Sequence, residues 1–130
     1  MQLEIHRFAD TVVAAPAGRI DHLGAAPFQA ALQPLLDEVC AARSALVLDF
    51  ARVEYISSVG LRVLMVSARQ TREQQAQLLV ANLQTVVREI FAISRFDRVL
   101  TVVPTLDEAM AQCGAQAQVQ YRAAAGAPRP

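Results

Sequence analysis

Two short apolar runs constrain the fold of this chain most: ALVLDF at residues 45–50 and AQLLVANL at residues 76–83. Strands covered on both faces have nearly continuous apolar sequences, and they occur mainly in parallel sheets with helices on the faces. Segments with apolar residues at helical spacing alternate with these runs. We therefore expect an α/β domain with buried central strands.

The helical segments show apolar residues every three or four positions. One such face begins at Ala25, and further helices are predicted over residues 61–71, 84–94 and 105–113. Thr105 with Glu108 three residues later forms a capping box that opens the last of them. Residues 3–8 and 11–18 flank a turn and predict an N-terminal hairpin. The fold class is a mixed sheet with this hairpin at its start and about four helices.

Length and composition indicate a single domain followed by a tail. A chain of 130 residues can bury one core but is too short for two domains of ordinary size. After Gly114 the sequence AQAQVQYRAAAGAPRP offers few large apolar residues. We expect a domain over residues 1–114 and a mobile C-terminal tail over residues 115–130.

Charge and cysteine content argue against several functional classes. Twelve basic and twelve acidic residues cancel, which does not favour nucleic acid or a membrane as partner. Cys40 and Cys113 lack the paired spacing of a metal or redox site. The sequence shows neither a signal-peptide pattern nor an apolar stretch long enough to span a bilayer. We expect a cytoplasmic protein without a metal or cofactor.

The stretch YISSVGLRVLM at residues 55–65 places two adjacent serines before a helix. A hydrolase nucleophile is disfavoured, because Ile56 stands where the elbow motif GxSxG needs its first glycine and only two histidines could supply a base. A nucleotide-binding loop is disfavoured by the single glycine and the missing lysine. We therefore expect no catalytic residue here.

Two interpretations of the serines remain. Ser57 or Ser58 could simply cap the helix, which spacing alone favours because serine is common at this position. Alternatively, a hydroxyl at the helix head could accept a phosphate, since the positive end of the helix dipole stabilises the dianion. Arg62 lies four residues after Ser58 and could approach the modified group.

Four blocks in order resemble the STAS family, the sulfate-transporter and anti-sigma-factor-antagonist domain: GRIDHLGA, LVLDFARVEYISSVGLRVLMVSAR, LLVANL and QTVVREIFAISRFDRVL. The resemblance covers about residues 2–113. It implies a SpoIIAA-like mixed sheet with helices chiefly on one face. The family's central motif commonly has a modified serine two residues before a glycine, and Ser58, Gly60 and Leu61 match that serine, glycine and leucine.

The resemblance also implies a partner-binding face. Ser57 occupies the place of an acid in the family motif and is a rival phosphate acceptor. Asp21 matches the family's aspartate after the second strand, with His22 adjacent; Asp21 could equally cap the first helix or its preceding turn. The residues expected to bind a partner are Asp21, His22, Ser57, Ser58, Gly60, Leu61 and Arg62.

The function implied by the resemblance is that of a non-enzymatic anti-sigma factor antagonist. Its partner would be an anti-sigma factor that is also a serine kinase with a histidine-kinase-like ATPase fold, and a PP2C-type phosphatase could reverse the modification. Phosphorylation at Ser58 would release the partner. The alternative is a STAS subunit of a transport or other signalling assembly that is never phosphorylated.

Overall fold

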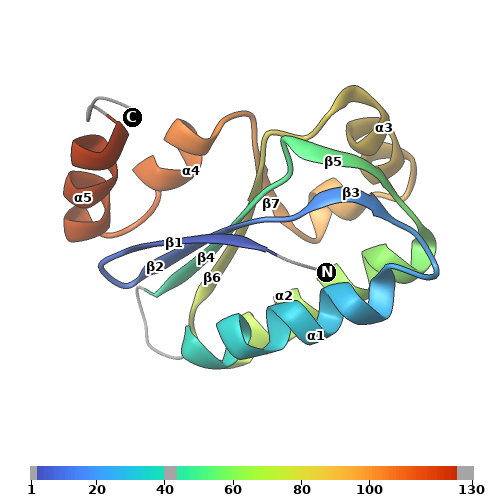
Figure 1. Cartoon of the computed structure of the whole chain (residues 1–130), viewed down its shortest axis with the longest axis horizontal. Helices are drawn as coiled ribbons and strands as arrows, with labels where there is room; N and C mark the ends of the chain where they lie inside the picture. Colours follow the sequence, from blue (N-terminus) through green and yellow to red (C-terminus); the bar gives the residue numbers. More distant parts are fainter. Residues whose placement is uncertain (1–2, 40–43, 126–130) are drawn as a thin grey trace.

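The computed structural model describes residues 3–39 and 44–125. Figure 1 shows a sheet with helices on both of its faces. The elements in chain order are β1 (Glu4–Phe8), β2 (Thr11–Ala15), β3 (Ala17–Ile20), α1 (Ala25–Glu38), β4 (Ala45–Asp49), β5 (Arg52–Ile56), α2 (Ser58–Glu73), β6 (Gln77–Ala81), α3 (Thr85–Ile93), the 3-10 helix η1 (Phe96–Arg98), β7 (Thr101–Val103), α4 (Leu106–Ala111) and α5 (Ala115–Ala125).

The main sheet has five strands in the order β1-β2-β4-β6-β7. The β1–β2 pair is antiparallel, as expected for the N-terminal hairpin, and the remaining pairs are parallel. Both apolar runs of the sequence form central strands. The first is β4, which lies between β2 and β6, and the second is β6, which lies between β4 and β7. The predicted mixed α/β fold is confirmed.

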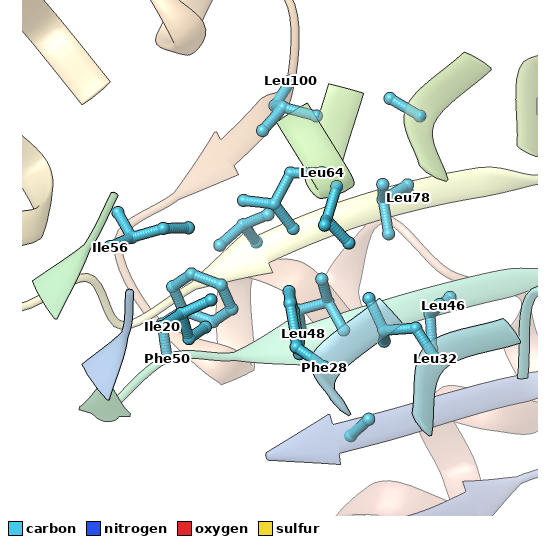
Figure 2. Close-up of a cluster of buried hydrophobic side chains, with 14 of the residues drawn as sticks. Ile20, Phe28, Leu32, Leu46, Leu48, Phe50, Ile56, Leu64, Leu78 and Leu100 are labelled. Carbon is cyan, nitrogen blue, oxygen red and sulfur yellow. The ribbon is translucent and has the colours of Figure 1, made fainter. Parts of the chain in front are cut away.

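Side chains from alternate positions of the central strands enter two separate cores. In β4, Leu46 and Leu48 face the larger core, whereas Ala45 and Val47 face the smaller one. Figure 2 shows the larger core, where Phe28 of α1 and Leu64 of α2 approach the sheet. Among the described residues there are five α-helices; α1, α2 and α3 contribute to the larger core, and α4 and α5 cover the opposite face.

A second, two-stranded sheet joins β3 and β5 in parallel and was not predicted. Its strands are short, and its register shifts between Gly18 and Arg19. The inner side chains at the strand ends, Ile20 and Ile56, are almost completely buried in the larger core. This small sheet matters for the site because it brings two loops together at its carboxyl edge.

The expectation of a mobile tail from residue 115 is wrong for residues 115–125, which form α5. Ala117 is completely buried in the smaller core. The ring of Tyr121 meets Phe8 edge-on, with 5.6 Å between ring centroids, and the Gln120 side chain accepts the Ala9 N–H at 2.7 Å. These contacts anchor α5 over the β1–β2 turn (Figure 1). Residues 126–130 lie outside the described residues.

Removing residues 115–130 is therefore expected to destabilise the domain. The truncation uncovers the part of the smaller core that Ala117 covers, and it removes the aromatic pair of Phe8 and Tyr121. Such a pair contributes roughly 1 kcal/mol beyond its buried area. We expect the thermal midpoint to fall by more than about 5 °C, the shift that corresponds to about 1 kcal/mol for a domain of this size. The exposed-site variant Val119→Ala is the matched control and should leave the midpoint unchanged. An unchanged midpoint after truncation would show that α5 adds no stability.

Candidate functional site

The site lies where β3 and β5 end side by side. Ile20 is the register partner of Ile56, and the Ser57 N–H donates to the Ile20 carbonyl at 2.8 Å. Asp21 directly follows β3, and Ser57 directly follows β5. The loop before α1 and the head of α2 are therefore neighbours. The structure thus brings together two segments that are more than thirty residues apart in the sequence.

The two adjacent serines have different roles at the head of α2. Ser57 has extended backbone angles, φ −87° and ψ 172°, and its Oγ accepts the Gly60 N–H at 3.2 Å. It is the N-cap, and it is half-buried. Ser58 is the first helical residue and is exposed. The capping role that the sequence allowed for either serine belongs to Ser57.

Gly60 allows α2 to approach the small sheet closely. A Cβ at this position would lie 2.7 Å from Ile56 Cγ1, 2.8 Å from Ile20 Cγ2 and 2.9 Å from the Ile20 carbonyl oxygen. Distances below 3.0 Å are not tolerated without movement of the neighbours. The glycine therefore fixes the position of the serines relative to β3 and β5. Leu61, the next residue, is 4% exposed and packs in the larger core.

Asp21 forms a capping turn before α1. Its Oδ1 accepts the Leu23 N–H at 3.1 Å and the Gly24 N–H at 3.0 Å, while its carbonyl accepts the Ala25 N–H at 2.9 Å. The hydrogen bond from Gly24 is the main reason that the pKa of Asp21 lies below its ordinary value. Asp21 thus shapes the loop that the resemblance assigns to partner binding.

The Asp21→Ala variant is expected to lose stability in a pH-dependent manner. Because the pKa of Asp21 is lower in the folded state than its ordinary value of 3.8, its contribution is present above pH 3.8 and is lost as the pH falls through the folded-state pKa. Urea denaturation at pH 7 should show the variant less stable than the wild type, and the gap should narrow below pH 3.8. A gap that is equal at both pH values would contradict the capping role.

The remaining predicted site residues divide into exposed and buried positions. His22 is exposed in the loop before α1, and Arg62 is exposed on α2. Gly60 and Leu61 are buried, so they support the site from beneath. Two neighbouring apolar residues were not among the site residues predicted from the sequence. The structure exposes both of them: Leu23 is 75% exposed and Val59 is 46% exposed. Exposed apolar residues of this kind are typical of protein interaction surfaces.

Three further observations concern metal binding, cysteine chemistry and membrane insertion. Within residues 3–39 and 44–125, no group of three or more His, Cys, Asp or Glu side chains is placed to hold a metal ion. Cys113 is buried, and burial raises the pKa of its thiol, whereas Cys40 lies outside the described residues. In the same part of the chain, none of the helices combines the length and apolarity that crossing a membrane requires.

Comparisons with known proteins assign the chain to a family. The family model described as "Mlab, STAS domain" matches residues 5–104. The chain belongs to the STAS domain family. It is also 32% identical over 111 residues to BtrV of Bordetella bronchiseptica, a protein named as a candidate anti-sigma factor antagonist; the match covers 85% of this chain and 93% of BtrV.

Solved STAS structures share the fold at lower sequence identity. A candidate anti-sigma factor antagonist from Thermotoga maritima superposes with a TM-score of 0.77 at 18% identity, covering 85% of this chain and 93% of that one. The Bacillus protein SpoIIAA in its phosphorylated form gives 0.62 at 18% identity, covering 85% and 98%. The expected SpoIIAA-like fold is therefore confirmed, and the STAS domain here belongs to a regulatory, non-enzymatic family, as expected.

Proposed function

We propose that this STAS domain is an anti-sigma factor antagonist whose binding to a partner is switched by phosphorylation at Ser58. The partner is an anti-sigma factor that is also a serine kinase with a histidine-kinase-like ATPase fold. The unmodified domain binds this kinase, and the phosphorylated domain releases it. A PP2C-type phosphatase restores the binding form.

One observation carries the proposal: Ser58 is exposed at the head of α2, whereas Ser57 uses its hydroxyl as the helix cap. The kinase would transfer the γ-phosphoryl group of ATP to the Ser58 Oγ. The hydroxyl proton passes to a base of the kinase, a phosphate ester bond forms, and ADP leaves. The resulting dianion lies at the positive end of the α2 dipole, which stabilises it without unfolding the domain.

Two further observations support the proposal. BtrV, the relative at 32% identity, is named as a candidate anti-sigma factor antagonist, and SpoIIAA has been solved in both unphosphorylated and phosphorylated forms. His22 and Leu23 are exposed in the loop before α1, and Val59 is exposed next to the proposed acceptor in the sequence, which gives the mixture of apolar and polar groups that an interface requires.

The two serines should respond oppositely to replacement by alanine. Ser57→Ala removes the cap and is expected to cost about 1 kcal/mol of unfolding free energy, yet it leaves the acceptor in place. Ser58→Ala should retain wild-type stability and lose phosphorylation. Urea denaturation measures the first difference, and intact-mass spectrometry after incubation with kinase and ATP measures the second.

The function is tested by incubating the protein with each candidate kinase of this class encoded in the same genome, beginning with the neighbouring genes. Tandem mass spectrometry then locates the phosphate. Phosphate on Ser58 is the expected result. Modification found on Ser57 alone would overturn the assignment of the acceptor. Stable binding to a partner with no phosphate on either serine would instead support the alternative of a plain interaction subunit.

A further inference from the structure

A groove begins at Ser58 and follows the exposed side of α2. Its volume is about 540 Å³, and residues that follow α3 form its opposite wall. The apolar lining includes Leu61, Met65 and Phe96, while the charged lining consists of Arg62 and Arg69. The proposed phosphate acceptor therefore shares one surface depression with apolar side chains and two cations.

The charge of this groove is positive in the unmodified protein. No carboxylate is among the described residues that line it, and the nearest acid in sequence is Asp97 of η1. The arginine–carboxylate ion pairs in residues 3–39 and 44–125 join Arg7 to Glu38 and Arg52 to Glu4. Neither groove arginine takes part in them. A segment that complements the groove would present apolar side chains flanked by acidic ones.

The two arginines lie at different distances from the acceptor. Arg62 is one helical turn after Ser58, a spacing that places Cβ atoms about 6 Å apart on the same face. Arg69 is eleven residues after Ser58, roughly 16 Å along the helix at a rise of about 1.5 Å per residue. A phosphate on Ser58 can thus pair with Arg62 but not with Arg69. An anion that precedes a cation by four residues is also the favourable order on a helix.

We propose that Arg62 transmits the state of Ser58 to this groove, an inference that rests on the phosphorylation proposed above. In the unmodified protein, Arg62 and Arg69 bind acidic side chains of a kinase segment whose apolar residues enter the groove. In the modified protein, the phosphate pairs with the Arg62 guanidinium. The groove then keeps one available cation and carries negative charge at its entrance, so the acidic segment is repelled.

Binding measurements examine the role of the groove in the unmodified protein. The variants Arg62→Gln and Arg69→Gln should each bind the kinase roughly tenfold more weakly than the wild type, because each removes a cation that faces an acidic partner. Each should also show a weaker dependence of affinity on salt concentration. Wild-type affinity and salt dependence in both variants would overturn the acidic-segment proposal.

The pairing of Arg62 with phosphate can be measured without any kinase, in protein that carries genetically encoded phosphoserine at position 58. A ³¹P NMR titration gives the second pKa of the phosphate, which a neighbouring cation lowers. We expect this pKa to rise by roughly half a unit or more in Arg62→Gln, a modest shift for an exposed pair. The matched variant Arg69→Gln should leave it unchanged.

An equal phosphate pKa in wild type and Arg62→Gln would overturn the role of Arg62, as would equal shifts in the two variants. Because the phosphoserine is installed during translation, this result is independent of whether a kinase modifies Ser58 in the phosphorylation assay. Failure of that assay would contradict the proposed function, whereas failure of the titration would contradict only the inference about Arg62.

Discussion

The Gly60→Ala variant is expected to lose roughly 1 to 3 kcal/mol of unfolding free energy, the range observed for overpacking of a well-packed core. The new Cβ would lie within 3.0 Å of two buried isoleucine side chains and of the Ile20 carbonyl oxygen. That oxygen cannot retreat freely, because it accepts the Ser57 N–H. The loss occurs although alanine forms helices better than glycine by about 1 kcal/mol.

Chemical denaturation of Gly60→Ala and of a matched variant, Gly114→Ala, measures this effect. The Cβ of the control would come no closer than 3.6 Å to Asp10, an ordinary contact, so we expect little change in its stability. Stability of Gly60→Ala equal to or above that of the wild type would show that α2 does not depend on close approach to the small sheet. The position of the serines would then need another explanation.

The Ser58→Asp variant is expected to bind the kinase at least about a hundredfold more weakly than the wild type. A carboxylate on the interface must be desolvated or placed against neighbouring acid, and such mismatches cost several kcal/mol. Since each 1.4 kcal/mol or so corresponds to a factor of ten, a loss of about 3 kcal/mol gives the hundredfold change. Ser58→Ala removes a hydroxyl without adding charge, so its affinity should stay close to that of the wild type.

Much of the fold could be predicted from the sequence because its signals are local. The buried runs of β4 and β6 and the helical spacing in α1, α2 and α3 identify these elements. The small sheet of β3 and β5 was missed because its short strands are stabilised by tertiary contacts of Ile20 and Ile56. Pairing between distant strands has no periodic signature in either segment.

Helix α5 was missed for a related reason. Its sequence contains alanine and glutamine in place of a stripe of large apolar residues, and its docking depends on the small side chain of Ala117 and on Tyr121. Such contacts are specific to the site at which the helix docks. Composition alone therefore suggested a tail where the structure has a helix.

The candidate site shows the same division between local and tertiary information. The sequence assigned the phosphate acceptor to Ser58 through its register with Gly60 and Leu61, but spacing alone left open which of Ser57 and Ser58 caps α2. That decision depends on backbone conformation, since Ser57 is extended and caps Gly60, whereas Ser58 is already helical. The capping turn of Asp21 was one of two open interpretations, and its adjacency to Ser57 depends on the β3–β5 pairing.

Calorimetric titration of the cognate kinase with wild type, Ser58→Ala and Ser58→Asp tests the phosphorylation switch most directly. Circular dichroism first establishes that all three proteins are folded. We expect similar affinity for wild type and Ser58→Ala and at least about a hundredfold loss for Ser58→Asp, equivalent to roughly 3 kcal/mol. Wild-type affinity in Ser58→Asp, or lost binding in folded Ser58→Ala, would contradict a switch that operates through negative charge at this residue.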